Sequence, residues 1–384
     1  MLWEVKVSKL CNLRCRYCYE YPDLGDPTRI PIEGWRKILE SARWYHEKLQ
    51  RESRDEEVVT QIVWHGGEPL LLPLSYFEEV LALQREVLGA EALAARRYTN
   101  HVPTNLYTAP PRLIDLLRRE GFQLAVSFDA TPGVRITAGG RPSEERVRAN
   151  IAQLLADGWV MGLNVVLGAH NATQLPVVYD DLRRMARSSG GTLYHMNVIP
   201  LHGTPTDDGR QQWSLPADGI VEALAGLFEK WIVDPEPLPV HPLRDIHLNI
   251  LRKRQGLGRT FYDRRGYGES CLIVNTDGCL YLFNDMYERD RSLGCLFERP
   301  FSEIMRSPEY EASLARDEAI TARICGGCPY DGYCNHQPLI TGLRDQPGPR
   351  CAIGFDLHQR VEDALTASPD RTRNRGEYPA RLAL

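Results

Sequence analysis

The chain has 384 residues, of which 43% are hydrophobic, so it is long enough to bury a large core and to form two or three domains. A formal net charge of −5 gives no electrostatic reason to expect nucleic-acid binding. No run of about 18 apolar residues occurs, so we expect no membrane-spanning helix. The first strand candidate starts directly after Met1 and leaves no room for a signal peptide, which favours a cytoplasmic location.

Strand candidates alternate with helix candidates along the first half of the chain. The predicted strands are 2–7, 58–64, 97–102, 123–128, 160–167 and 192–199. Helical periodicity predicts helices over 32–49, 74–88, 111–120, 143–157 and 175–188. This alternation predicts βαβ units with a parallel sheet, and therefore an α/β fold of the partial (β/α)6 TIM-like barrel type.

The composition changes after residue 200. The stretch to residue 242 is rich in Gly, Pro and Asp and contains one predicted helix, 217–232, which is typical of a connector. We therefore divide the chain into the barrel (1–200), a connecting region (201–265), a small cysteine-rich domain with a β-hairpin and helices (266–360), and a flexible C-terminal tail (361–384).

The ten cysteines form two groups. Three lie between Cys11 and Cys18, seven lie between Cys271 and Cys351, and the long stretch between the groups has none. In a large chain with these spacings, metal ligation is favoured over disulfide formation.

The first group follows the first predicted strand at a C-x3-C-x2-C spacing, formed by Cys11, Cys15 and Cys18. Three thiols are one too few for a closed four-coordinate site. A cubic iron–sulfur cluster bound this way keeps one iron free for a substrate or cofactor. The alternatives are a chance cluster or a zinc site completed elsewhere, although structural zinc usually uses pairs of ligands.

Polar residues and turns follow several predicted strands, at the edge where parallel α/β sheets place their active sites. The segment Gly66-Gly67-Glu68-Pro69 follows the second strand, and its glycines allow the backbone to approach a ligand closely; the alternative is an ordinary turn. The other polar residues at strand ends are Thr104, Asn105, Ser127, Asp129, Asn164, His195 and Asn197. For Asp129 a turn or capping role is an equal alternative, and His195 also fits a hydrogen-bonded core histidine.

The first cysteine motif, with Tyr17 before its last cysteine, resembles the radical S-adenosylmethionine (SAM) superfamily. The resemblance implies that Cys11, Cys15 and Cys18 hold a four-iron cluster and that Tyr17 lies near the adenine of SAM. It also matches the Gly66–Pro69 segment to the family's GGEP segment, which contacts the amino group of SAM. Ser127 and Asn164 are the implied candidates for the ribose and the methionine carboxylate, although Ala130 stands where relatives have a glycine.

The second cysteine group resembles the SPASM extension of radical enzymes, which normally binds two auxiliary four-iron clusters. The resemblance implies Cys271, Cys279 and Cys295 for auxiliary cluster I, and Cys325, Cys328, Cys334 and Cys351 for auxiliary cluster II. Pro338 occupies the position of an eighth cysteine. Cluster I would then have an open iron, a water, a substrate ligand, or a substitute such as Asn335 or His336. A four-cysteine zinc site is the alternative for the second set.

The resemblance implies an enzyme that uses SAM and three [4Fe-4S] clusters, with reduced ferredoxin or flavodoxin as electron donor. The stretch from His65 to Leu71 most resembles maturases of ribosomally made peptides, including the cyclophane-forming group. We therefore expect a precursor peptide as substrate and a crosslink from a side-chain β-carbon as product. The first alternative is an anaerobic sulfatase maturase, which forms formylglycine. Those enzymes have an aspartate after the third auxiliary-I cysteine, whereas this chain has Leu296. A cluster protein without radical chemistry is the second alternative. No residue is singled out as a catalytic base.

Overall fold

The computed structural model describes residues 1–53, 57–201, 210–257, 269–283, 289–334, 351 and 353–367. These residues fall into two compact units. The first takes the described residues of Met1–Ser127, Pro132–Met161 and Tyr262–Thr321, and the second those of Phe128–Thr131, Gly162–Phe261 and Ala322–Leu384. Among them, no helix is both long and apolar enough to cross a membrane.

The first unit contains most of the β/α alternation. Its strands are β1 (Leu2–Ser8), β2 (Thr60–Gly66), β3 (Tyr98–Thr104), β4 (Gln123–Ser127), β8 (Cys271–Val274), β9 (Cys279–Leu282) and β10 (Gly294–Cys295). Its helices are α1 (Ile32–Glu52), α2 (Leu74–Leu88), α3 (Ala90–Ala94), α4 (Pro111–Arg119), α5 (Glu144–Ala156) and α10 (Phe301–Ile304), together with the start of α11 (Pro308–Cys325) and the short 3-10 helices η1 (Tyr21–Asp23), η2 (Pro69–Leu71) and η6 (Arg289–Arg291).

The sheet of this unit has the order β10-β9-β8-β1-β2-β3-β4. The strands from β8 to β4 are parallel, and β9 and β10 add an antiparallel edge. β1 is paired on both sides, because Leu2 lies beside Gln61 of β2 and beside Cys271 of β8. The hairpin that carries Cys271 and Cys279 therefore continues the sheet of β1–β4.

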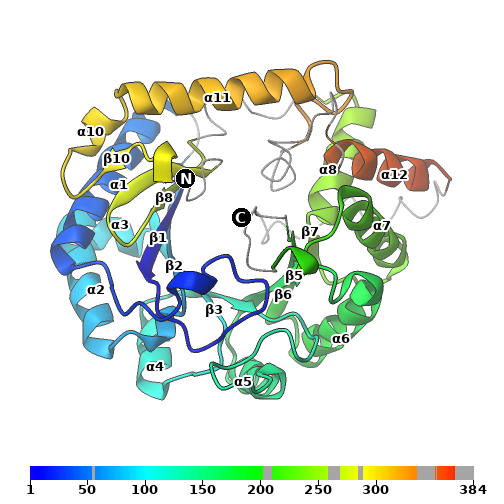
Figure 1. Ribbon diagram of the computed structural model, residues 1–384, viewed down its shortest axis with the longest axis horizontal. Helices are drawn as coiled ribbons and strands as arrows, with labels where there is room; N and C mark the ends of the chain where they lie inside the picture. Colours follow the sequence, from blue (N-terminus) through cyan, green and yellow to red (C-terminus); the bar gives the residue numbers. More distant parts are fainter. Residues whose placement is uncertain are drawn as a thin grey trace. The chain divides into compact units, whose positions relative to one another are not determined.

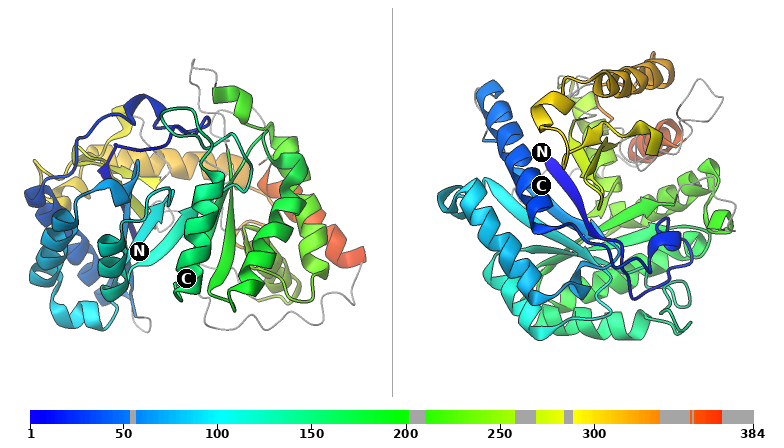
Figure 2. Two further views of the ribbon diagram at one scale, coloured as in Figure 1. Left: turned by 90° about the horizontal axis from the view of Figure 1, so that it is seen from below. Right: turned by 60° about the vertical axis from the view of Figure 1, so that its left-hand side comes forward.

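One face of this sheet is packed against helices. Trp64 of β2 stacks on Phe77 of α2 at 4.9 Å between ring centroids and packs on Trp35 of α1 at 4.8 Å. Figures 1 and 2 show α1 and α2 side by side along the strands, consistent with their mutual packing. Strand residues alternate in direction, so Glu4, Lys6 and His65 belong to the opposite face.

The second unit is smaller. Its elements are β5 (Met161–Leu167, from Gly162 onward), η3 (Ala172–Gln174), α6 (Leu175–Ser188), β6 (Leu193–Pro200), η4 (Arg210–Trp213), α7 (Ala217–Val233), β7 (Val240–His241), α8 (Leu243–Arg254) and α12 (Gly354–Ala367). The strands lie in the order β5-β6-β7, with β6 and β7 parallel. Helix α7 buries Leu224, Phe228 and Trp231 and packs against both α6 and α12 (Figure 1).

The six predicted strands and five predicted helices of the first two hundred residues are present, with ends shifted by a few residues. Three features differ from the expected domain plan. The connecting region contains β7 and α8 in addition to the predicted helix. The cysteine hairpin belongs to the same unit as β1–β4. Helix α12 crosses the boundary drawn at residue 360 and continues to Ala367, while 368–384 lie outside the described residues.

Candidate metal centres and active site

The segment from Cys11 to Cys18, here called the cysteine loop, is fixed by backbone hydrogen bonds. The N–H of Arg14 donates to the carbonyl of Ile136 at 2.6 Å, and the N–H of Arg16 donates to the carbonyl of Val134 at 3.1 Å. The buried side chain of Leu13 anchors the loop in the core. The three cysteines of the loop are partly exposed residues, so a bound group would have access from outside.

Nitrogen donors point at two of the loop sulfurs. The Leu13 N–H and the Asn105 Nδ2 reach Cys11 Sγ at 3.4 Å and 3.6 Å, and Arg135 Nη1 reaches Cys15 Sγ at 3.8 Å. Burial raises the pKa of the Cys11 thiol to about 11, against the opposing effect of the Leu13 amide. Metal binding would therefore release a proton, after which the N–H donors would stabilise the thiolate. The donor set fits a thiolate-bound iron–sulfur cluster.

Gly66, the last residue of β2, and Gly67 allow close contact with the backbone just before the cysteine loop. Gly66 has a φ of +130°, and a Cβ there would lie 2.1 Å from the carbonyl oxygen of Ser8. A Cβ on Gly67 would lie 2.3 Å from the carbonyl oxygen of Lys9. The Gly67 N–H donates to the Ser8 carbonyl at 2.9 Å. Close backbone packing alone thus requires glycine at both positions.

Glu68 is the buried centre of a hydrogen-bond network. Its carboxylate accepts from the Leu70 N–H at 2.9 Å, the Thr104 hydroxyl at 2.8 Å and the Asn105 N–H at 2.7 Å. Burial raises the pKa of Glu68 to about 7, and the three donors act in the opposite direction. The carboxylate therefore fixes the turn that follows β3.

Asn105 connects the hydrogen-bond network of Glu68 to the cysteine loop. Its Nδ2 donates to Asn12 Oδ1 at 2.9 Å as well as contacting Cys11 Sγ. Asn105 was recognised in the sequence only as a polar residue after a predicted strand. The structure makes it a direct neighbour of a predicted cluster ligand.

The remaining predicted SAM-binding residues lie in both units. In the first unit, Tyr17 is buried with the Arg135 guanidinium 5.5 Å from its ring centroid, and Ser127 is the last residue of β4. In the second unit, Asn164 Oδ1 accepts from Asn197 Nδ2 at 3.2 Å. Ala130 has a φ of +53°, so the turn keeps the left-handed conformation that a glycine would adopt without strain.

The first auxiliary set lies on the β8–β9–β10 edge of the first unit. Cys279 and Cys295 are directly opposite each other in the β9–β10 pair, and the Cys295 thiol donates to the Asp277 carbonyl at 3.4 Å. Cys271 belongs to a buried cluster with Ile273 and Tyr281, against which Cys279 packs. Burial raises the pKa of Cys271 well above its ordinary value. Asn335, His336 and Pro338 lie outside the described residues.

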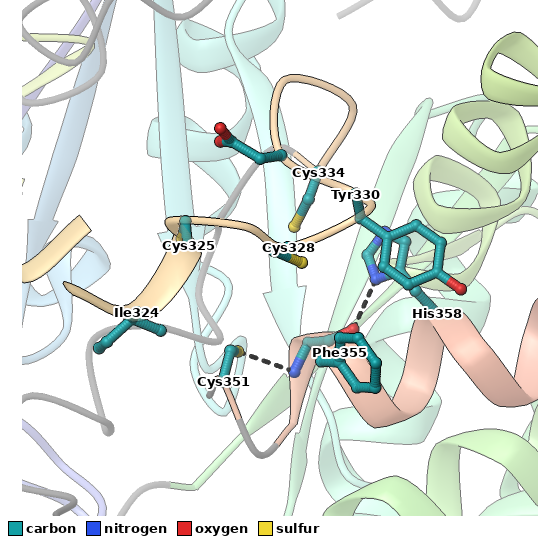
Figure 3. A pocket seen from close by; sticks show the side chains of 10 residues that line it. Ile324, Cys325, Cys328, Tyr330, Cys334, Cys351, Phe355 and His358 are labelled. Carbon is teal, nitrogen blue, oxygen red and sulfur yellow. Dashed lines mark hydrogen bonds between the residues drawn. The ribbon is translucent and has the colours of Figure 1, made fainter. Parts of the chain in front are cut away.

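The second auxiliary set lines one pocket of the second unit, here called the four-cysteine pocket: Cys325, Cys328, Cys334 and Cys351. Figure 3 shows the Cys328 and Cys334 sulfurs close together and Cys351 across from them, with Tyr330, Phe355 and His358 beside the site. The Gly354 N–H donates to Cys351 Sγ at 3.1 Å, and burial raises the pKa of Cys351. Four cysteines that line one pocket, with an amide donor to one of them, fit a four-thiolate metal centre, either an iron–sulfur cluster or zinc.

In the described part of the chain, no three His, Cys, Asp or Glu side chains are already assembled as a metal-ion site. Within each cysteine set, the described side chains therefore lack the distances of a finished coordination shell.

Residues 5–182 match the family model of the radical SAM superfamily. The chain therefore carries a radical SAM domain over these residues, and the protein is an enzyme. Over a longer range it is similar to the serine-type anaerobic sulfatase-maturating enzyme of Klebsiella aerogenes, with 25% identity over 84% of this chain and 78% of the relative. It is also similar to the PqqA peptide cyclase of Xanthomonas campestris pv. campestris, with 29% identity over 45% of this chain and 41% of the relative.

Two solved structures share the fold. Native anSMEcpe with bound AdoMet and a peptide aligns with a TM-score of 0.72 and 17% identity, covering 96% of this chain and 97% of the other. SuiB of Streptococcus suis bound to precursor peptide SuiA aligns with a TM-score of 0.59 and 12% identity, covering 91% of this chain and 73% of the other. These similarities confirm the predicted fold class, a partial TIM-like (β/α)6 arrangement followed by a cysteine-rich region.

Proposed function

We propose that this enzyme is a peptide maturase that abstracts a side-chain hydrogen from a ribosomally synthesised precursor peptide and forms an intramolecular crosslink, with a C–C bond of the cyclophane type favoured. The observation that carries the proposal is the cysteine loop: three partly exposed thiols held beside Asn105 and Arg135, which leave one iron of a cluster open. One relative is named as a peptide cyclase, and one structurally similar protein was solved with a precursor peptide. Both support the choice of a peptide as substrate.

The residues that would hold each cofactor are those predicted from the sequence. Cys11, Cys15 and Cys18 would hold the first cluster, and SAM would lie against Tyr17, Gly66–Pro69, Ser127 and Asn164. When bound and reduced, the cluster and SAM together supply a 5′-deoxyadenosyl radical. A cytoplasmic ferredoxin or flavodoxin would donate the electron.

The chain's own residues orient these groups. Glu68 orders Asn105, and Asn105 contacts Cys11 Sγ, so the loop keeps its shape before the cluster is loaded. The four-cysteine pocket would hold the second auxiliary cluster, and Cys271, Cys279 and Cys295 would hold the first auxiliary cluster, with an iron open for substrate. Both sets would serve as acceptors of the electron left on the oxidised peptide.

The second candidate is formylglycine formation on a protein substrate. It is favoured by the similarity to a sulfatase-maturating enzyme over 84% of the chain. Against it stands Leu296, which is 3% exposed and whose N–H donates to the Gly278 carbonyl at 2.9 Å. An apolar side chain buried at this position offers no proton acceptor, unlike the aspartate expected in that family.

The test uses the full chain reconstituted with iron and sulfide, together with SAM, a reductant and a candidate precursor peptide identified from a short reading frame near its gene. We expect a product lighter by two hydrogens for each crosslink, with fragmentation blocked between the joined residues. Oxidation of a serine gives the same mass change, so hydroxylamine is added to the product. An oxime would show an aldehyde and establish the second candidate.

A reaction in which 5′-deoxyadenosine forms while the mass of the peptide stays unchanged would contradict the proposal. Cys15→Ala supplies the negative control, because it removes a predicted ligand of the SAM-binding cluster. A sulfatase peptide supplied under the same conditions is the matched substrate control.

A further inference from the structure

Lys6 is a charged residue buried in the first unit. It lies on β1, on the face that turns away from α1 and α2, and it is 1% exposed. Its Nζ forms an ion pair with the carboxylate of Glu20, whose side chain is 12% exposed. The same Nζ lies 4.8 Å from the centroid of the Tyr19 ring. A buried ammonium group is costly unless it is paired, so the contact with Glu20 offsets the cost of burying Lys6.

The partners of Lys6 belong to residues 19–23, which follow the cysteine loop and are here called the exit segment. Lys9, just after β1, binds the other end of this segment, because its Nζ lies 2.7 Å from Oδ2 of Asp23. The second pair is more open to solvent, since the side chains of Lys9 and Asp23 are 17% and 43% exposed. The exit segment is therefore attached at β1 by one buried and one exposed ion pair.

Backbone hydrogen bonds connect the exit segment to the cysteines. The Cys18 N–H donates to the Cys15 carbonyl at 3.0 Å, and the Tyr21 N–H donates to the Cys18 carbonyl at 3.2 Å. The Cys11 N–H donates to the carbonyl of Leu24 at 3.1 Å. The chain from Cys11 to Leu24 thus closes on itself, and the Lys6–Glu20 pair fixes the part that follows Cys18.

The charge of Lys6 also reaches the loop. Burial lowers the pKa of Lys6 to about 7, and Lys9 acts in the same direction, whereas Glu4, Cys18 and Asp23 act to raise it. The Cys18 sulfur is therefore near enough to interact with the ammonium group. A thiolate-bound cluster in the loop would add negative charge and favour the charged form of Lys6.

We infer that Lys6 is a positioning residue of the cysteine loop: through Glu20 it holds Cys18 in place, and its ammonium group favours the reduced form of a cluster bound there. The inference rests on the proposed assignment of Cys18 as a ligand of the first cluster. The electron that a ferredoxin or flavodoxin would supply adds one negative charge to that cluster. A fixed positive charge in a buried site stabilises the added charge more than it would in water.

The first test measures the loop without a cluster. Hydrogen exchange over residues 10–25 of the unloaded full chain should become about tenfold faster in Lys6→Met and in Glu20→Gln, because each leaves one buried partner unpaired. The double variant Lys6→Met/Glu20→Gln should exchange no faster than either single variant, because both changes act through one ion pair. Lys48→Met is the matched control, since this lysine lies on α1 with its Nζ 5.4 Å from the Tyr45 ring centroid. It should exchange here as the wild type does.

The second test measures a potential, which separates the charge of Lys6 from its effect on the shape of the loop. The reconstituted full chain is titrated with reductant and followed by electron paramagnetic resonance on the signal that changes when SAM is added. At the wild-type midpoint potential, the ratio of reduced to oxidised cluster should fall about tenfold in Lys6→Met, which is 59 mV for one electron. Glu20→Gln keeps Lys6 and removes a negative charge, so the ratio should not fall. Lys48→Met should keep the wild-type ratio.

Wild-type exchange and a wild-type potential in Lys6→Met would overturn the inference. An equal fall of the potential in Lys6→Met and Glu20→Gln would also overturn it, because the ammonium charge would then have no effect of its own. If Lys6→Met does not fold, the double variant takes its place, since it leaves no buried charge unpaired, and wild-type exchange in it would count against the inference. A reconstituted wild-type chain without a SAM-dependent signal would instead contradict the proposed cluster at the cysteine loop.

Discussion

The cysteine loop and the four-cysteine pocket surround their thiols in different ways. In the loop, the side chains of Asn105 and Arg135 contact the sulfurs, and three thiols are available. In the pocket, four thiols lie among aromatic residues such as Tyr330, and Cys351 Sγ accepts from a backbone amide. With the clusters proposed above, the loop would leave one iron open for a further ligand, whereas four thiolates in the pocket would complete the coordination and suit it to electron transfer.

The largest expected difference between the cysteine loop and the four-cysteine pocket comes from removing one thiol from each. Cys15→Ala should abolish release of 5′-deoxyadenosine, because the cluster proposed to bind SAM would lose one of its three ligands. Cys328→Ala should keep that release but lose crosslinked product and iron. Chromatography of 5′-deoxyadenosine and iron counting on both variants check this. Equal loss of SAM cleavage in both would mean that the regions are not functionally distinct.

Loss of the hydrogen bonds around Glu68 should lower SAM cleavage less than loss of a loop cysteine does. Glu68→Gln replaces an acceptor oxygen with an NH2 group that faces the N–H donor of Asn105, at a cost of about 1–3 kcal/mol. We expect SAM cleavage to fall about 10–100-fold, as for other residues that orient metal ligands. Glu79→Gln on the exposed side of α2 is the matched control. Unchanged cleavage in Glu68→Gln would show that the loop holds its shape without this carboxylate.

On the pocket side, Tyr330 links the cysteines to α12. Its hydroxyl donates to Glu362 Oε2 at 2.7 Å, and Lys253 Nζ contacts the same carboxylate at 3.1 Å. Tyr330→Phe should lower the free energy of unfolding by about 1–2 kcal/mol and leave SAM cleavage intact. Denaturant unfolding and 5′-deoxyadenosine release measure the two effects. A drop in cleavage would connect the pocket to the first step of the reaction.

The smallest expected effect is on the pH dependence of stability. Burial raises the pKa of Glu68 to about 7, so the folded chain binds a proton that the unfolded chain releases near its ordinary pKa. The resulting stability is present at low pH and is lost as the pH rises through 7. Between pH 6 and pH 8 the wild type should lose about 1 kcal/mol more than Glu68→Gln. Melting curves at both pH values measure the difference, and parallel curves would contradict the raised pKa.

The sequence predicted the strands and helices of the first two hundred residues because apolar periodicity and the turns between elements were both regular there. It also placed polar residues at the ends of strands, where Asn105 meets Cys11. It assigned Gly66 and Gly67 to ligand contact, whereas their packing against Ser8 and Lys9 already requires glycine. A single sequence does not reveal which backbone lies opposite a glycine.

Two strand pairings join residues that are far apart in the sequence, so local sequence patterns did not predict them. The sequence predicted a β-hairpin in the cysteine-rich region, but no local signal indicated that its first strand, β8, pairs with β1. β7 has two residues in a proline-rich stretch, and it brings His241 beside Asn197. Both β7 and α8 therefore lay in a region that the sequence indicated was only a connector.

The pairing of Leu2 with Cys271 also sets the order of events during synthesis. At about 5–20 residues per second, the ribosome needs roughly 15–50 s to make the intervening chain. During that interval β1 has one open hydrogen-bonding edge, the kind that pairs with other chains. Recombinant fragments that stop before β8 should therefore precipitate, and faster translation or a chaperone that covers β1 should raise the yield of the intact enzyme.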